Sequence, residues 1–140
     1  MERIGLVIKR AEQALINEKT RVLQEFRLTV PQYAALLVLL QTSEASAAQL
    51  ARSCLVTPQT MATVLENLEG KGLIERTVSP LHQRVRVARL TSEGTDLVRR
   101  ADRVVLAVER RLAAAFTADE RRMLTEHLER AIVALAHHGP

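Results

Sequence analysis

Four helix-start signals divide this chain of 140 residues into a succession of helices and constrain its fold more than any other feature. Where Gln or Glu stands three residues after Ser or Thr, each side chain can bond the other residue's backbone N–H in a capping box. Such pairs begin at Thr29, Ser46 and Thr117, and Thr57 precedes Pro58, a residue that suits the first turn of a helix. Each signal predicts a helix that begins at the next residue.

Apolar residues at spacings of three and four predict long amphipathic helices at both ends of the chain, over about 2–27 and 92–116. These helices have more apolar surface than a central unit of about 50 residues can cover, because so small a unit buries a limited core. We therefore expect them to pack against a second copy of the chain; a monomeric helical bundle is the alternative. The residues expected to be buried only between two chains are Leu97, Val104, Val108, Leu112, Leu128 and Ile132.

In the middle of the chain, a pair of glycines ends the fourth predicted helix, and two extended segments follow it. Gly70 and Gly72 end the helix that starts after Thr57. The runs 73–78 and 85–90 predict two short strands. The predicted fold is mainly α with a small β-hairpin between the fourth and fifth helices.

Composition narrows the class of protein. Apolar residues make up 47% of the chain, charged residues 26% and aromatic residues 2%, which indicates a folded core of Leu, Val, Ala and Ile. The single cysteine, Cys54, excludes a disulfide framework; we expect a small buried thiol, with a redox role as the alternative.

No nucleophile–base pair, Gly-rich phosphate loop or metal-spaced cluster is visible, so neither an enzyme nor a cofactor is expected. The chain lacks an apolar run of membrane-spanning length and a signal-peptide pattern, so a cytoplasmic location away from membranes is expected.

Two neighbouring segments carry groups suited to nucleic acid. The short helix after Ser46 and the helix after Thr57 form a helix-turn-helix pattern, and the second helix exposes Gln59, Thr60 and Thr63, which can donate to and accept from base edges. The alternative is an ordinary solvent-exposed helix face, which would carry the same kinds of residue. The stretch 76–92 adds a basic segment without any acid, where DNA phosphate would make internal partners unnecessary; an ordinary basic hairpin is the alternative. Its arginines are Arg76, Arg84, Arg86 and Arg89.

Three segments together resemble the MarR family of winged helix-turn-helix transcriptional regulators. They are LTVPQYAALLVL, ASAAQLARSCLVTPQTMATVLENLEGKGLIER and QRVRVARLTSEG. The resemblance covers essentially the whole chain and implies one winged-helix regulator domain over 1–140, with a DNA-binding lobe at about 30–92. It implies a homodimer held by helices at about 1–27 and 92–137, a recognition helix over 57–71 and a wing at about 79–87.

The resemblance also bears on the tip of the wing, where this chain departs from the family, and on a pocket for an effector. Members commonly have Asp-x-Arg at the wing tip; here Arg84 takes the place of the arginine, and His82 that of the aspartate. Many members release DNA when small aromatic or hydrophobic compounds bind between the dimer helices and the DNA-binding lobe. Val7, Ala11, Tyr33 and Leu36 lie where such a pocket could form; for each of them individually, a position in a filled core is the favoured alternative.

The sequence therefore predicts a homodimeric regulator, a repressor that binds a pseudo-palindromic DNA duplex and responds to an effector. Gln59, Thr60 and Thr63 are expected to read bases, and Arg84 is expected to enter the minor groove or hold its phosphates. Thr57, Arg76 and Arg86 are expected to hold the DNA backbone. The alternative is a winged-helix module that binds a protein partner without specific DNA binding.

Overall fold

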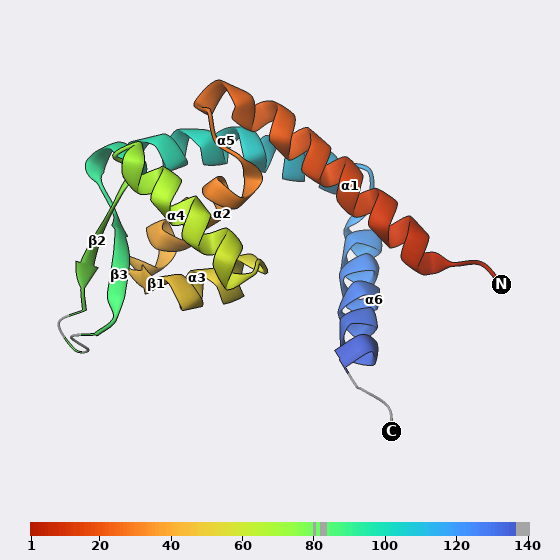
Figure 1. Ribbon diagram of the computed structural model, residues 1–140. Helices are drawn as coiled ribbons and strands as arrows, with labels where there is room; N and C mark the ends of the chain where they lie inside the picture. The colour runs from red at the N-terminus through yellow and green to blue at the C-terminus, as the bar shows by residue number, and fades with distance from the viewer. Residues whose placement is uncertain (80, 82–83, 137–140) are drawn as a thin grey trace. The chain divides into compact units, whose positions relative to one another are not determined.

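The computed structural model describes residues 1–79, 81 and 84–136. The chain divides into two compact units, Met1–Val105 and Leu106–Pro140, and the second is described as far as Ala136. Figure 1 shows the succession of elements. The first unit contains α1 (Ile4–Leu23), the 3₁₀-helix η1 (Gln24–Phe26), α2 (Val30–Thr42), β1 (Ala45–Ser46), α3 (Ala47–Cys54), α4 (Pro58–Gly70), β2 (Ile74–Val78), β3 (Arg86–Leu90) and most of α5 (Ser92–Ala114). The second contains the end of α5 and α6 (Ala118–Ala136).

The predicted helix starts are confirmed at the level of individual hydrogen bonds. Thr29 and Ser46 form capping boxes with Gln32 and Gln49, and Thr57 accepts the backbone N–H of Thr60. A reciprocal pair between Thr117 and Glu120 begins α6. These contacts join residues three apart, so they form wherever the local sequence provides them.

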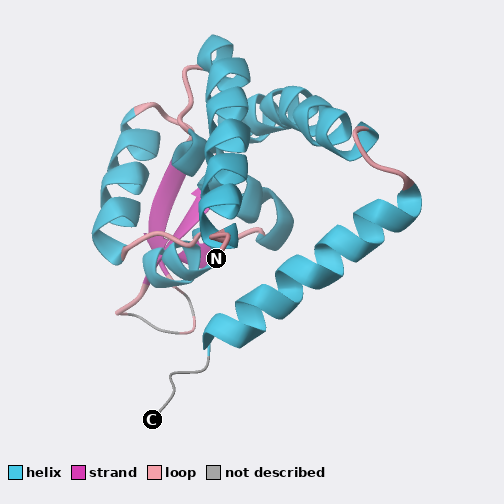
Figure 2. Ribbon diagram, turned by 90° about the vertical axis from the view of Figure 1, so that its right-hand side faces the viewer, coloured by secondary structure: helices cyan, strands magenta, loops and turns pink. Residues whose placement is uncertain are grey.

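The three strands form an antiparallel sheet in the order β1-β3-β2, shown in magenta among the helices in Figure 2. Ile74 pairs with Leu90 and Val78 with Arg86, so each strand is one residue shorter than predicted. The two-residue β1, which pairs Ala45 with Ala88, is missing from the sequence prediction. A strand this short shows no alternation of apolar and polar residues that could identify it.

The core of the first unit is aliphatic, as the composition indicates, and joins α2, α3, α4, the sheet and α5. Its wholly buried large side chains are Leu23, Leu36, Leu39, Leu50, Met61, Leu65, Leu68 and Val98. Tyr33 also lies in this core, and its hydroxyl donates to the carboxylate of Asp102, which links α2 to α5. This core fixes the positions of α4 and the hairpin on one rigid lobe.

Large apolar side chains remain exposed on α1 and α6. On α1 they include Ile4 and Leu6, and on α6 they include Leu128 and Ile132. The expectation that six residues need a second chain for their burial is wrong for Val108, which is only 6% exposed in one chain. Leu97 is partly buried against the core of one chain. Among the described residues, no helix is both long enough and apolar enough to cross a membrane.

Candidate nucleic-acid interface

A helix-turn-helix formed by α3 and α4 occupies one side of the first unit. Leu55 turns the chain between the two helices in the left-handed region, at φ 57°, and its side chain is 92% exposed. Val56 follows, and Thr57 then caps α4. The connection is short because one left-handed residue reverses the chain direction.

One face of α4 is buried and the opposite face is open to solvent. Met61, Val64, Leu65 and Leu68 pack into the core. The residues predicted to meet DNA, Thr57, Gln59, Thr60 and Thr63, are all exposed. An exposed helix face with short polar side chains is the geometry that major-groove reading requires.

The hydrogen bonds on this face distinguish the threonine hydroxyls, which bond within the helix, from the Gln59 amide group. The Thr57 hydroxyl accepts the N–H of Thr60, and the two hydroxyl oxygens lie 2.9 Å apart. The Thr63 hydroxyl donates to the backbone oxygen of Gln59 at 3.3 Å. Among the described residues, we find no hydrogen bond from the Gln59 amide group. The threonines thus support the helix and retain only part of their bonding capacity, whereas Gln59 keeps its donors and acceptor.

The strand register places the hairpin arginines on two different faces. Arg76 pairs with Ala88 and lies on the same face as Arg86, which is the face toward the core and α4. Arg89 pairs with Glu75 on the other face. Paired residues share a face and neighbours in a strand alternate, so these arginines cannot act as one continuous basic strip.

The prediction that the arginines need no internal partner is wrong for Arg76 and Arg89. Arg76 donates from Nη2 to the Glu69 carboxylate at 3.0 Å, which links β2 to the end of α4. Arg89 donates from Nε to the Glu44 carboxylate at 2.9 Å, which links β3 to the segment before β1. Both acids lie outside the acid-free stretch, and only the fold brings them to the hairpin.

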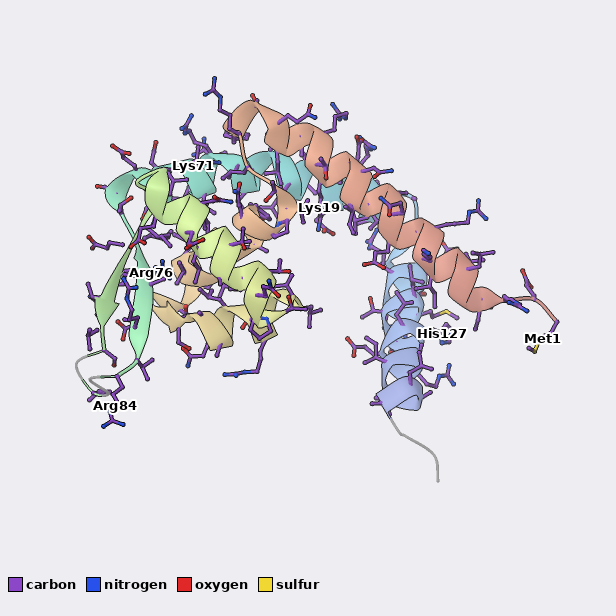
Figure 3. All side chains as sticks on the ribbon, viewed as in Figure 1. Met1, Lys19, Lys71, Arg76, Arg84 and His127 are labelled. Atoms are coloured by element: carbon purple, nitrogen blue, oxygen red, sulfur yellow. The ribbon has the colours of Figure 1, made fainter. Side chains whose placement is uncertain are left out.

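Arg84 and Arg86 are exposed, and among the described residues no ion pair involves either. In Figure 3, Arg84 lies near the tip of the hairpin with its side chain directed away from the strands, whereas Arg76 lies along β2. His82, which takes the place of the usual wing aspartate, lies outside the described residues. The hairpin therefore combines two arginines that are held by carboxylates with a cation near its tip, Arg84, that has no ionic partner in the described part of the chain.

Glu69 is bonded to Arg76 and lies in the positive field of Arg86 as well. The hydrogen bond from Arg76 holds the pKa of Glu69 below its usual value, and the positive charges of Arg76 and Arg86 act in the same direction. A carboxylate with a lowered pKa stabilises the folded state above its unfolded-state pKa, and this contribution disappears as the pH falls through the folded-state pKa.

Replacing Glu69 by glutamine is therefore expected to lower stability at pH 7 and to have a smaller effect at about pH 3, because protonation of the Glu69 carboxylate with falling pH removes the charge that glutamine lacks. Urea unfolding of both proteins at the two pH values measures this. Glu66→Gln, on the exposed face of the same helix, is the matched control. A Glu69→Gln effect of equal size at both pH values would show that the contact with Arg76 is not ionic.

The comparisons with known proteins agree with this geometry. A family model described as MarR family matches residues 28–85, which run from the start of α2 to the end of the wing loop. The chain is 37% identical over 127 residues to HTH-type transcriptional repressor Rv2887 of Mycobacterium tuberculosis, a match that covers 91% of each protein. This chain belongs to the MarR family.

Solved structures show the same fold in this MarR-family relative. Rv2887 in complex with DNA is 34% identical, with a TM-score of 0.71 over 94% of this chain and 98% of that one. Rv2887 in complex with p-aminosalicylic acid is 35% identical, with a TM-score of 0.73 over 93% and 98%. In MarR-family terms, α4 is the recognition helix and the β2–β3 hairpin is the wing.

The residues predicted for a MarR-type effector pocket are divided between two environments. Tyr33 and Leu36 lie in the core at 6% and 0% exposure. Val7 and Ala11 are exposed on α1. The single chain does not gather the four around a described cavity, and their role stays a prediction.

Cys54, at the end of α3, is half-buried and packs against the core. Burial raises the pKa of its thiol, so a smaller fraction is thiolate at neutral pH. We expect Cys54 to react with 5,5′-dithiobis(2-nitrobenzoate) several-fold more slowly than glutathione at pH 8, and unfolding in guanidinium chloride should remove the difference. A rate equal to or above that of glutathione in the folded protein would favour a reactive, redox-active thiol.

Proposed function

We propose that this protein is a transcriptional repressor that binds a pseudo-palindromic DNA duplex as a homodimer. The observation that carries the proposal is the exposed polar face of α4, centred on Gln59, beside a wing whose tip arginine, Arg84, has no ion pair among the described residues. A groove-reading helix next to a basic loop provides base contacts and phosphate contacts from one rigid lobe. The relative Rv2887 has been solved in complex with DNA, which supports DNA binding by this chain.

Within this proposal, Gln59, Thr60 and Thr63 read base edges, and Arg84 enters the minor groove or holds its phosphates. Thr57 and Arg86 hold the DNA backbone. Arg76 acts together with Glu69, because its guanidinium is already bonded to that carboxylate. Its effect on DNA comes partly through the angle at which the wing leaves α4.

The homodimer is supported by the exposed apolar residues of the terminal helices, among them Ile4, Leu6, Leu128 and Ile132. Large exposed apolar patches usually mark interfaces. Sedimentation at low micromolar concentration is expected to give twice the chain mass of 15.6 kDa. A folded monomer at that concentration contradicts this part of the proposal.

In this proposal the protein acts on DNA in the cytoplasm. DNA binding is tested by selecting bound duplexes from a random pool. The affinity for the selected duplex is then measured across a salt series. A specific binder enriches a two-fold-related motif, and its affinity falls steeply with salt because phosphate contacts release counterions. A protein-interaction module enriches no motif and shows almost no salt-dependent affinity for DNA. Those two results together would replace the proposal with that alternative.

We also propose that a small aromatic or hydrophobic effector regulates DNA binding. The support is the complex of the relative Rv2887 with p-aminosalicylic acid. Adding such compounds to a preformed complex with the selected duplex tests whether they release the DNA.

A further inference from the structure

Leu55, in the turn between α3 and α4, has a backbone conformation and a side-chain exposure that do not favour folding. Its backbone lies in the left-handed region, at φ 57° and ψ 41°, where the β-carbon of any residue other than glycine is strained against the following carbonyl. Its side chain is 92% exposed. A leucine this exposed gains almost no burial when the chain folds, so the side chain does not offset the strain of its own backbone.

The turn does not use the leucine side chain. The Leu55 N–H donates to the backbone oxygens of Ala51 and Arg52, and the Val56 N–H donates to the Ala51 oxygen at 3.1 Å. All of these bonds join backbone atoms and would form equally well with glycine. Val56, the next residue, is the one that packs against the core. A strained residue whose side chain contributes nothing to the fold indicates a role outside the chain.

The position of Leu55 places its side chain beside the bases that α4 would read. Leu55 comes two residues before Thr57, the N-cap of α4, so the Cα atoms of the two residues are at most about 7 Å apart. A recognition helix contacts base edges in the major groove with its N-terminal residues, which here include Gln59. The wing follows the other end of α4, about 20 Å away along the helix. Leu55 is therefore at the end of α4 that meets the bases.

We propose that Leu55 is a specificity-determining residue whose side chain packs against the 5-methyl group of a thymine in the major groove. Thymine is the base that presents a methyl group there, so an apolar side chain at that edge favours thymine. This inference rests on the DNA-binding function proposed above. A leucine neutralises no phosphate, so its contact adds sequence preference and leaves the salt dependence of binding unchanged.

Three substitutions separate the apolar side chain from the backbone strain. Leu55→Gly removes both, Leu55→Asn accepts the left-handed backbone but provides a polar side chain, and Leu55→Met keeps an apolar side chain of similar volume. Arg27→Gly is the matched control, because Arg27 is also exposed and left-handed, at φ 54°. It lies at the opposite end of α4, where its backbone oxygen accepts a hydrogen bond from Lys71.

Selection of duplexes from a random pool is repeated with each variant. The wild type, Leu55→Met and Arg27→Gly should enrich the same half-site, whereas Leu55→Gly and Leu55→Asn should lose the preference for thymine at one position and keep the rest of the motif. On the wild-type duplex, Leu55→Gly should bind about tenfold more weakly, as the loss of one methyl-sized contact in each half-site of a homodimer does. Its salt slope should equal that of the wild type.

Thermal unfolding tests whether the side chain serves the fold. Relief of the left-handed strain should raise the melting temperature of both Leu55→Gly and Arg27→Gly by about 2–5 °C. Leu55→Gly should thus gain stability while it loses affinity for the selected duplex. A Leu55→Gly protein that is less stable than the wild type would show that the leucine supports the helix-turn-helix, and would overturn the inference.

Deoxyuridine in place of the preferred thymidine tests the methyl group itself, because this change removes the 5-methyl group alone. It should weaken binding of the wild type about three- to fivefold for each half-site and leave binding of Leu55→Gly unchanged, since the contact is already absent. Equal losses in both proteins, or the same motif and affinity for both, overturn the role of Leu55 while the proposed function stands. If the wild type enriches no motif, the proposed function fails and this inference fails with it.

Discussion

Replacing Gly94 by alanine is expected to destabilise the protein by at least about 3 kcal/mol and to lower the melting temperature by about 10 °C or more. Gly94 is the third residue of α5, and a Cβ there would lie 2.0 Å from the backbone oxygen of Leu73 and 2.9 Å from its carbonyl carbon. Both atoms belong to backbone that cannot move independently, because the same Leu73 oxygen accepts the N–H of Thr91. Relief of the clash would have to separate the start of α5 from the turn between α4 and β2.

Gly70→Ala is the matched control for this effect. Gly70 is the last residue of α4, and a Cβ there would have no atom within 4 Å. Since alanine favours helix over glycine, this change is expected to be neutral or to stabilise by up to about 1 kcal/mol. Thermal and urea unfolding of the two variants measures both effects. A Gly94→Ala protein with the melting temperature of the wild type would mean that α5 does not pack this closely on Leu73.

Alanine substitutions of Gln59 and Arg84 are expected to separate base reading from phosphate binding. Gln59→Ala should cost about 1–3 kcal/mol for each base contact on the selected duplex and little on a scrambled one. Arg84→Ala should weaken binding to both duplexes, because the Arg84 side chain is expected to contact phosphate or a narrow groove whatever the DNA sequence. It should also flatten the log–log salt dependence by about one unit for each phosphate neutralised, and so by about two in a homodimer.

Fluorescence anisotropy of both duplexes across a salt series measures these effects. Arg110→Ala, an exposed position near the end of α5, makes the same change in net charge away from the wing. It should change neither affinity nor slope appreciably. The roles assigned to helix and wing are wrong if Gln59→Ala weakens both duplexes equally while Arg84→Ala alters neither.

The sequence by itself determined the helix starts and the exposed polar face of α4. The capping contacts of Thr29, Ser46 and Thr117 join residues three apart, so distant parts of the chain are not needed to form them. The apolar stripe of α4 likewise follows from spacing along one helix, and the opposite face, with Gln59 and Thr63, follows with it.

Only the tertiary structure decided which cationic side chains have a bonding partner within the protein. Arg89 meets Glu44 across 45 positions of the chain, Lys71 meets the Arg27 oxygen across 44, and Arg76 meets Glu69 once β2 turns back beside α4. The acid-free stretch around the wing gave no sign of these partners, because charge pairing depends on distance in space and not on position in the sequence.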